Sequence, residues 1–340
     1  MTLQHNFSLG GLTTFGCRSE AQYFARVSTL EELKAALAEA QSLGIKVHLL
    51  GGGANTIARE HIRGLVLKID IKGFDLQPHG EDEALVTVGA GEVFDDVIRR
   101  TIEAGYSGLE NLSAIPGTVG GAVVQNIGAY GVELAEHFVS VRIWDRQSQS
   151  ERVLTLEDCD FAYRHCVFKM PKASQWVIIS AVLRVTKSFK PVIGYKDVEQ
   201  VLEREGLTAE TLTSAKMAEI IREIRARKLP NPAEIGNAGS FFTNPIVNKV
   251  LWKKVLTTTP SLTTYKIGGG RMKIAAASLI EAAGFKGQKA GNVGVSDRHA
   301  LILVNHGGAT GEEVLVFAQS IQNKVEALYG VRLAMEPVVL

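Results

Sequence analysis

This chain of 340 residues has few cysteines, almost no excess of one charge and no long apolar run. Its three cysteines, Cys17, Cys159 and Cys166, are too few and too irregularly spaced for a disulfide framework or a zinc site. Basic and acidic side chains number 37 and 36, so we expect neither a nucleic acid nor an anionic membrane as a partner. Any anion-binding site must therefore be local.

No segment approaches the roughly 20 apolar residues that a membrane-spanning helix needs. The first 16 residues also lack the basic region and apolar run of a secretory signal. We therefore expect a cytoplasmic protein with reduced thiols and no metal. Its length, with 46% hydrophobic residues, predicts two or three domains.

Strands and helices are both predicted, without strict alternation, so the expected fold class is α+β. Thr29 with Glu32, and Thr310 with Glu313, have the spacing of capping boxes that open helices. Other helices are expected at residues 93–104, 211–229 and 272–283, and from Pro245. Strands are expected at residues 45–50, 65–69, 84–88, 138–144, 152–156, 176–185, 301–304 and 331–340.

The first glycine-rich loop follows a predicted strand at residues 51–56. Successive backbone N–H groups in such a turn can bind an anion, and a diphosphate would suit it. The loop lacks the Lys-Ser/Thr of a P-loop and the GxGxxG spacing of a dinucleotide fingerprint. Taken alone, it is equally compatible with a structural turn.

The second glycine-rich segment spans residues 116–131. Glycine this frequent is costly for an element that only has to pack. Close approach of the backbone to a flat, extended ligand is therefore favoured over a purely structural loop.

The most distinctive segment is residues 236–245, where Gly239 leaves room beside Ser240. Asn244 and Pro245 have the residue types of a helix N-cap and first turn, so Ser240 could be an ordinary turn hydroxyl. A serine hydrolase is disfavoured, because no serine lies in a GxSxG elbow.

These segments together resemble the UDP-N-acetylenolpyruvoylglucosamine reductase family, over essentially the whole chain. The resemblance rests on residues 51–55, 116–122, 126–131, 161–164, 228–230, 236–245 and 336–337. It implies a vanillyl-alcohol-oxidase (PCMH) type of FAD-binding fold with a C-terminal substrate-binding α+β domain. The implied boundaries are residues 1–70 with 331–340, residues 71–210, and residues 211–330.

The resemblance also implies a catalytic set of Arg164, Ser240 and Glu336. In the family, NADPH reduces FAD, flavin N5 gives a hydride to C3 of the enolpyruvyl ether, and Ser240 gives a proton to C2. Arg164 would hold the charge that builds on the substrate carboxylate. From the residues alone, the favoured interpretation of Arg164 and Glu336 is that both are exposed surface charges, because most charged side chains are exposed.

Binding residues follow from the same resemblance. The implied FAD contacts are Gly51, Gly52, Gly53, Ala54, Asn55, Thr56, Gly89, Pro116, Gly117, Thr118, Gly120, Gly121, Asn126, Gly128, Ala129 and Tyr130. The implied substrate contacts are Tyr195, Arg225, Lys228, Asn244, Tyr265, Lys273 and His299. Tyr195 matches the lid tyrosine of the longer, type I branch. Ala54 stands where the family commonly has Ser, and His299 where some relatives have Gln.

Two alternatives remain open from the sequence. One is an FAD oxidase of the same fold, although no His or Cys lies beside Gly117 or Gly121 for a covalent flavin link. The other is a non-catalytic nucleotide-sugar binder. The favoured reading is a monomeric reductase that uses FAD, NADPH and UDP-N-acetylglucosamine enolpyruvate.

Overall fold

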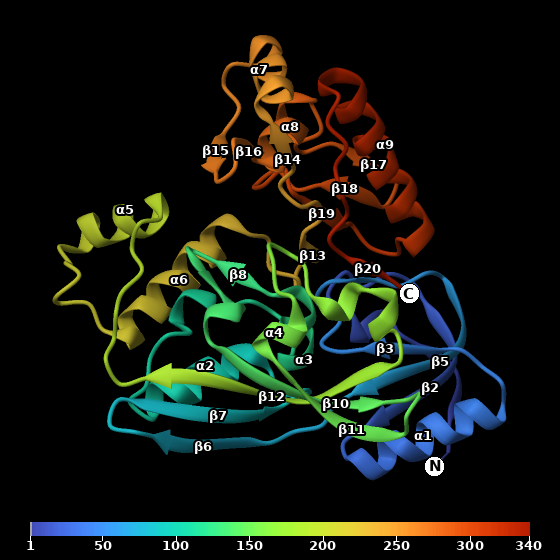
Figure 1. Ribbon diagram of the computed structural model, residues 1–340. Coiled ribbons are helices and arrows are strands. Elements are labelled where there is room, and N and C mark those ends of the chain that lie inside the picture. Colours follow the sequence, from blue (N-terminus) through green and yellow to red (C-terminus); the bar gives the residue numbers. More distant parts are fainter. Residues whose placement is uncertain (1) are drawn as a thin grey trace. The chain divides into compact units, whose positions relative to one another are not determined.

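A computed structural model describes residues 2–340, and its contacts divide the chain into two compact units (Figure 1). The first unit holds the residues up to His5, Tyr23–Gly52 and Arg63–Arg227. The second holds Asn6–Gln22, Gly53–Ile62 and Lys228–Leu340. The chain passes between the units several times, and one of these passages lies within the first glycine-rich loop, between Gly52 and Gly53. The three-domain division remains a prediction.

One sheet, most of whose residues belong to the first unit, has the strand order β1-β2-β5-β3, with β3 and β5 parallel. Its strands are β1 (Gln4–Ser8), β2 (Glu20–Val27), β5 (His61–Ile69) and β3 (Val47–Leu50). Helix α1 (Leu30–Ser42) begins where expected, because Thr29 accepts a hydrogen bond from the Glu32 N–H. The Glu32 carboxylate bonds the N–H of Ser28, one residue earlier than a capping box predicts. The helix buries Leu33, Ala36 and Ala40.

The larger sheet of this unit is antiparallel, in the order β11-β10-β12-β7-β6. Its strands are β6 (Phe74–His79), β7 (Glu83–Gly89), β10 (Phe138–Asp145), β11 (Ser150–Thr155) and β12 (Trp176–Thr186). The central strand β12 is buried from Val177 to Ala181, as expected for a strand covered on both faces. Helices α2 (Phe94–Glu103) and α3 (Val119–Gln125) lie on this sheet, and α4 (Leu156–Cys159) follows β11.

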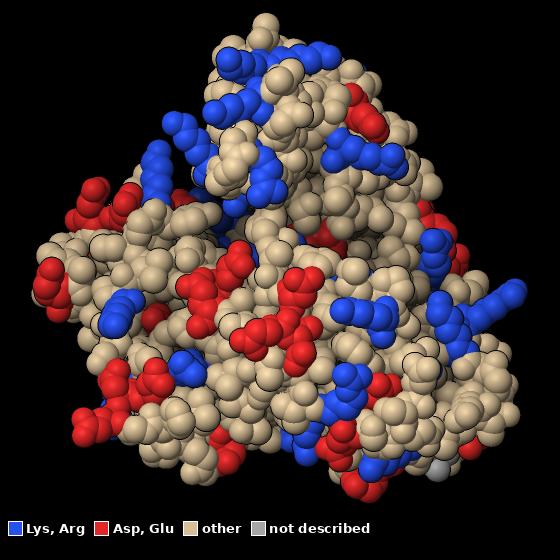
Figure 2. Space-filling model, in the orientation of Figure 1, with Lys and Arg blue, Asp and Glu red and all other residues tan. Residues whose placement is uncertain are grey.

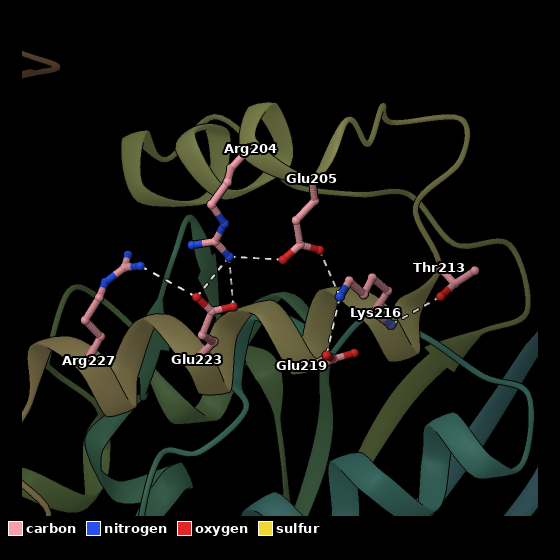
Figure 3. A network of polar contacts seen from close by, with 7 residues as sticks. All are labelled: Arg204, Glu205, Thr213, Lys216, Glu219, Glu223 and Arg227. Carbon is pink, nitrogen blue, oxygen red and sulfur yellow. Dashed lines mark hydrogen bonds and ion pairs between the residues drawn. The ribbon is translucent and has the colours of Figure 1, made fainter.

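A small helical arm completes the first unit. It consists of α5 (Lys196–Glu205) and α6 (Ser214–Lys228) with a hydrophobic core of its own. Val198, Val201 and Leu202 of α5 pack against apolar residues of α6, including Ile220 and Ile224. A network of charged side chains also links the two helices (Figure 3).

The second unit contains a four-stranded sheet, β13-β19-β18-β17, and a three-stranded sheet, β14-β16-β15. These strands are β13 (Gly236–Ser240), β14 (Ile246–Asn248), β15 (Thr264–Ile267), β16 (Arg271–Ile274), β17 (Lys289–Ala290), β18 (Val293–Val295) and β19 (Ile302–Asn305). Its helices are α7 (Lys249–Thr258), α8 (Ala276–Ala282) and α9 (Gly311–Tyr329). The capping box of α9 is confirmed, because Thr310 and Glu313 bond each other's backbone N–H.

Short elements connect these larger ones. Two-residue strands occur at β4 (Thr56–Ile57), β8 (Gly128–Ala129), β9 (Val132–Glu133) and β20 (Val338–Val339). Short 3-10 helices occur at Gly10–Leu12, Glu110–Leu112, Leu134–Glu136, Val167–Lys169 and Pro171–Ala173.

Two helices of the second unit begin later in the chain than we predicted. Pro245 precedes strand β14, and the N-cap of α7 is Asn248, which accepts a hydrogen bond from the Leu251 N–H. Asn244 instead accepts a hydrogen bond from the N–H of Ala276, the first residue of α8. We expected a helix from residue 272, but residues 272–274 belong to strand β16, because β14 and β15 supply backbone partners there. Helix α8 begins only at Ala276.

Two other expectations also change. Residues 331–340 form only the two-residue strand β20, which pairs in parallel with β4 through Val338 opposite Thr56. The segment at residues 116–131 contains helix α3, although we expected a continuous loop. Left-handed Asn126 ends this helix at φ 39°.

Within residues 2–340, no helix is both long and apolar enough to cross a bilayer. The same residues contain no cluster of three His, Cys, Asp or Glu side chains that could hold a metal ion. All three cysteines are free and buried. Burial raises the pKa of Cys17 and of Cys159 to about 12, so neither is a reactive thiolate at neutral pH.

Candidate functional site

The two glycine-rich loops meet in the first unit. A Cβ atom added to Gly52 would lie 2.6 Å from Gly117 Cα and 2.9 Å from the Thr118 backbone N. Only glycine permits such an approach of two backbones. Two segments 65 residues apart in the sequence, Gly52 and Gly117, therefore form one surface.

One buried hydroxyl group at this surface has no hydrogen-bond partner in the part of the chain that the structure describes. Thr118 is the N-cap of α3, but its side chain makes no capping bond, and its buried Oγ1 has no hydrogen-bond partner among residues 2–340. A Cβ on Gly121 would have only this Oγ1 nearby, at 3.9 Å. The protein itself therefore does not require glycine at position 121. A polar ligand seated on the loop explains both observations.

The buried Lys68 side chain supports the first loop, because its ammonium donates a hydrogen bond to the Gly51 carbonyl oxygen. Burial lowers its pKa from the ordinary value. We name the surface formed by Gly51, Gly52, Gly117, Thr118 and Gly121 the glycine cradle. Closely spaced glycine backbones with a nearby ammonium group suit a diphosphate.

At three other predicted FAD contacts, packing within the protein already explains why the residue is glycine. A Cβ on Gly53 would lie 2.0 Å from the Leu12 oxygen, one on Gly89 2.4 Å from the Ile71 oxygen, and one on Gly120 3.2 Å from Ala90 Cβ. The remaining positions lie along the loops themselves. Ala54 accepts a bond from Thr14, Thr56 lies in β4, Pro116 is exposed, and Ala129 lies in β8.

Arg164 is anchored to the second glycine-rich segment. Its guanidinium donates hydrogen bonds to the carbonyl oxygens of Gly128, at 3.0 Å, and Asn126, at 3.4 Å. Its backbone is left-handed, with φ 54°, a conformation that costs a non-glycine residue roughly 1 kcal/mol. The Asn126 amide supports the same turn by donating to the Ala162 carbonyl at 3.1 Å. The side chain of Asn126 therefore organises the protein around Arg164.

A further contact of this turn was not predicted from the sequence. The Lys169 ammonium donates to the Arg164 carbonyl oxygen at 2.8 Å and to Gln125 Oε1 at 2.6 Å. It therefore ties the backbone of Arg164 to the end of α3. No local pattern marks Lys169, since its partners lie 5 and 44 residues away in the sequence.

Three more predicted residues gather in the first unit. The rings of Tyr130 and Tyr195 pack edge to face, with centroids 5.4 Å apart. Arg225 donates to the Ala114 carbonyl oxygen at 3.2 Å and to the side chain of Tyr130. Burial raises the pKa of Tyr130 and lowers that of Arg225. The phenol of Tyr130 is thus held neutral beside a fixed cation.

Ser240 and the segment of Glu336 are neighbours in the second unit. The Glu336 N–H donates to the carbonyl oxygen of Phe241 at 2.9 Å, and Asn55 donates to the Glu336 carbonyl oxygen at 3.1 Å. Gly239, at φ 68°, interrupts the pairing of β13 with β19 immediately before Ser240. Ser240 is the last residue of β13 and pairs with Ile302 beyond this irregularity.

Tyr265 and Lys273 pair directly across strands β15 and β16. The Lys273 ammonium lies 5.8 Å from the centre of the Tyr265 ring. Asn244 precedes β14 of the same sheet, but its side-chain oxygen is occupied by the N–H of Ala276. Its amide N–H₂ group remains the part of Asn244 that suits a ligand oxygen.

Lys228 and His299 are electrostatically coupled. Burial first, and then the charges of Lys228 and Lys286, lower the pKa of His299, so its imidazole is neutral at pH 7. The Leu301 N–H donates to His299 Nδ1 at 3.2 Å, which places the imidazole hydrogen on Nε2. A neutral His299 therefore still offers one N–H donor to an anion.

Family models match both parts of the chain. The model described as "FAD binding domain" matches residues 21–153, which include the whole glycine cradle. The model described as "UDP-N-acetylenolpyruvoylglucosamine reductase, C-terminal domain" matches residues 231–340, which include Ser240 and Glu336. The predicted fold, a PCMH-type FAD-binding fold with a C-terminal α+β domain, is confirmed.

Curated relatives match along nearly the full length. UDP-N-acetylenolpyruvoylglucosamine reductase from Cupriavidus pinatubonensis is 43% identical over 96% of both chains. The same enzyme from Pseudomonas aeruginosa is 40% identical over 99% of this chain and 98% of its own. The crystal structure of UDP-N-acetylenolpyruvylglucosamine reductase from Thermus caldophilus has the same fold, with a TM-score of 0.68, 24% identity and coverage of 100% and 99% of the two chains. This chain is an FAD-binding oxidoreductase that belongs to the UDP-N-acetylenolpyruvoylglucosamine reductase family.

Proposed function

We propose that this chain reduces the enolpyruvyl group of UDP-N-acetylglucosamine enolpyruvate to give UDP-N-acetylmuramate, with NADPH as the reductant. Membership of the reductase family supports the overall reaction in peptidoglycan precursor synthesis. The observation that carries the residue-level proposal is the fixed guanidinium of Arg164, bonded to two carbonyl oxygens of the FAD-binding loop.

The glycine cradle fits FAD. Gly51, Gly52, Gly117 and Gly121 would take the diphosphate, and the hydroxyl of Thr118 would gain the partner that the protein does not provide. When bound, FAD supplies the redox chemistry, taking a hydride from NADPH and passing it to C3 of the enolpyruvyl group. The protein's remaining task is to hold the substrate and to manage its charge and proton.

Arg164 would neutralise the charge that develops on the substrate. Once C3 has gained the hydride, negative charge builds toward C2 and the adjacent carboxylate. A guanidinium can bind a carboxylate with two parallel hydrogen bonds, and its effect is largest when it is already in place. The bonds of Arg164 to Gly128 and Asn126 supply that preorganisation.

Ser240 would give its hydroxyl proton to C2, which completes the saturated lactyl ether. A serine hydroxyl is a weak acid, so it needs a polarising neighbour. Glu336 is the carboxylate of the adjacent segment, whose backbone bonds Phe241 directly after Ser240. In this role Glu336 would orient the hydroxyl and relay a replacement proton to it.

The remaining predicted contacts would bind the nucleotide-sugar. Lys228, Lys273 and the Nε2–H of His299 would face its phosphates, with Asn244, Tyr265 and Arg225 as further polar contacts. Tyr195 at the start of α5 would close over the nucleotide, which would place the chain in the type I branch. We also propose that the enzyme acts as a cytoplasmic monomer.

The test separates the two half-reactions by anaerobic stopped-flow absorbance of the flavin. Ser240→Ala should bind FAD and be bleached by NADPH at close to the parental rate, because that step needs no proton at C2. Its reoxidation by UDP-N-acetylglucosamine enolpyruvate should slow by ~10²-fold or more, the low end of what a general acid contributes.

Ser240→Cys is the matched variant, because a thiol can also donate a proton. It should recover part of the reoxidation rate that Ser240→Ala loses. If Ser240→Ala is reoxidised as fast as the parent, Ser240 is only a turn residue and the proton has another source. A fold defect would instead lower the flavin content and slow both half-reactions together.

A further inference from the structure

The nearly neutral total charge conceals a segregation of charge along the chain. Residues 235–280 contain six basic side chains and no Asp or Glu. Of the 37 basic and 36 acidic side chains, 31 basic and 36 acidic ones therefore lie elsewhere. A segment of charge +6 is thus attached to a remainder of charge −5, with histidines counted as neutral.

Five of these cations are exposed on α7, β15 and β16, and we name them the lysine surface. They are Lys249, Lys253, Lys254, Lys266 and Arg271. Figure 2 shows Lys and Arg side chains, without acidic ones between them, over the part of the view where Figure 1 draws α7 and β15.

The lysine surface lacks counter-charges. None of its five side chains forms an ion pair with a carboxylate in the part of the chain that the structure describes. Exposed cations of the first unit are more often paired, as Arg99 is with Asp96 and Glu103, and Arg204 with Glu223. Lys249 and Lys253 even repel each other, because they stand four residues apart on one helix.

The surface borders a candidate phosphate contact. Strands β15 and β16 carry Lys266 and Arg271, and the same two strands pair Tyr265 with Lys273. Lys273 is only partly exposed, and its ammonium lies near the Tyr265 ring, whereas the five outer cations extend into solvent. The lysine surface therefore lies on the same two strands as Lys273, the proposed phosphate contact.

We infer that the lysine surface attracts nucleoside diphosphates to the active site, and that its residues raise the association rate without contacting the bound ligand. The inference rests on the proposed function, because both NADPH and the nucleotide-sugar carry a nucleoside diphosphate. Unpaired charge of one sign can raise the association rate of an opposite charge by 10- to 1000-fold. The effect weakens with salt, since the Debye length is about 30 Å at 0.01 M and about 8 Å at 0.15 M.

The experiment reverses three of these charges in the FAD-loaded enzyme. The variant Lys253→Glu/Lys254→Glu/Lys266→Glu leaves every proposed substrate contact in place. The matched control is Lys46→Glu/Arg63→Glu/Lys172→Glu, which reverses three exposed cations of the first unit. Both variants have the same total charge. Flavin content and thermal midpoint establish that each is folded.

The measurement is anaerobic stopped-flow of the flavin at ionic strengths from 10 to 300 mM, with ligand concentrations both far below and above saturation. One arm follows bleaching by NADPH, and the other follows reoxidation by the nucleotide-sugar. In the lysine-surface variant, the second-order rate constants should fall ~10-fold or more at 10 mM, the low end of electrostatic steering. They should converge with the parent at 300 mM, while the saturating rates stay parental.

The control should lose no more than about 2-fold at any salt concentration, because its reversed charges are distributed elsewhere. Equal losses in the two variants would show that only total charge matters, and would overturn the inference. So would second-order constants that stay parental, or a loss confined to the saturating rates. A loss in only one arm would limit the role to that nucleotide.

Failure of the proposed function has a different signature. A parent enzyme that NADPH bleaches but the nucleotide-sugar does not reoxidise would reject the proposed substrate. The NADPH arm would then still decide whether the lysine surface accelerates association.

Discussion

At the scale of single residues, the side chains that matter most for the proposed site are those whose bonding the protein leaves incomplete or makes unusual. Thr118 occupies an N-cap position, yet its hydroxyl neither caps α3 nor bonds any other group among residues 2–340. Arg164 has a left-handed backbone, and that backbone is bonded by Lys169. An unpaired buried hydroxyl and a left-handed non-glycine backbone each cost stability locally, so we expect each to serve a function.

Thr118→Val tests the first feature. Removing a buried, unpaired hydroxyl should raise the stability of the apoprotein or leave it unchanged, while FAD affinity falls ~5-fold through the loss of about 1 kcal/mol. The measurements are the thermal midpoint of apoprotein and a flavin-fluorescence titration.

Ser113→Ala is the control for Thr118→Val, since Ser113 Oγ is also buried and unbonded but lies outside the two glycine-rich loops. It should change stability in the same direction without affecting FAD. An unaltered FAD affinity in Thr118→Val would mean that the hydroxyl does not contact the cofactor.

Lys169→Met tests the second feature. Without the ammonium that bonds the Arg164 carbonyl and Gln125, the guanidinium loses preorganisation, and reoxidation by substrate should slow ~10-fold or more. Bleaching by NADPH should remain near parental, because Arg164 has no proposed role in that half-reaction. Lys169→Arg should recover part of the rate, since a guanidinium can reach both acceptors.

Lys172→Met is the control for Lys169→Met, because Lys172 is exposed and lies three residues further along the same segment. Both of its half-reactions should be parental. Parental reoxidation in Lys169→Met would show that Lys169 does not position Arg164.

At the scale of elements, the α5–α6 arm combines a small apolar core with an exposed network of charges (Figure 3). Arg204 bonds both carboxylate oxygens of Glu223, at 3.0 and 3.1 Å, and Lys216 lies 2.9 Å from Glu205. Tyr195 is the N-cap of α5, so any displacement of that helix moves the proposed lid residue. The apolar core holds the helices together, while the charges adjust their relative position.

Arg204→Ala should therefore raise the KM for the nucleotide-sugar ~2-fold at low salt, and this effect should vanish near 0.5 M salt as screening removes the contribution of the network. Bleaching by NADPH at saturation should not change. Steady-state kinetics over a salt series provide the measurement.

Arg99→Ala is the control for Arg204→Ala, because its two ion pairs lie within the single helix α2. If Arg204→Ala and Arg99→Ala behave alike, the network does not position α5.

Tyr195→Phe should weaken nucleotide-sugar binding by about 1 kcal/mol at every salt concentration, through loss of one hydrogen bond.

At the scale of the whole molecule, the free and buried state of every cysteine bears on how the cofactor is held. Cys17, Cys159 and Cys166 are each buried, and burial raises the pKa of each thiol. None is therefore suited to attack a flavin ring. In the proposed site, the glycine cradle would instead hold the diphosphate of the cofactor through non-covalent contacts.

All of the yellow colour should therefore appear in the supernatant when the holoenzyme is precipitated with acid. Absorbance of the supernatant and of the redissolved pellet gives the partition. Flavin retained in the pellet would favour the oxidase alternative, in which a side chain bonds the cofactor covalently.

The sequence by itself determined features that depend on neighbours along the chain. The capping residues Thr29 and Thr310 predicted the starts of α1 and α9, because the donor and acceptor lie within one turn. The ordered motifs also identified the family and its FAD-binding fold, since each motif is a contiguous run. The catalytic and binding roles assigned to individual residues remain predictions.

Only the tertiary structure decided which of these segments meet. Asn244 had the residue type of a local helix cap, but its side-chain oxygen accepts a hydrogen bond from the N–H of Ala276, 32 residues away. Gly52 and Gly117 form one surface, and Lys169 supports Arg164, only because β-sheet pairing and helix packing bring distant backbones together. The physical reason is the same in each case: buried hydrogen-bonding groups must be paired, and whether the partner is local or distant is settled by packing.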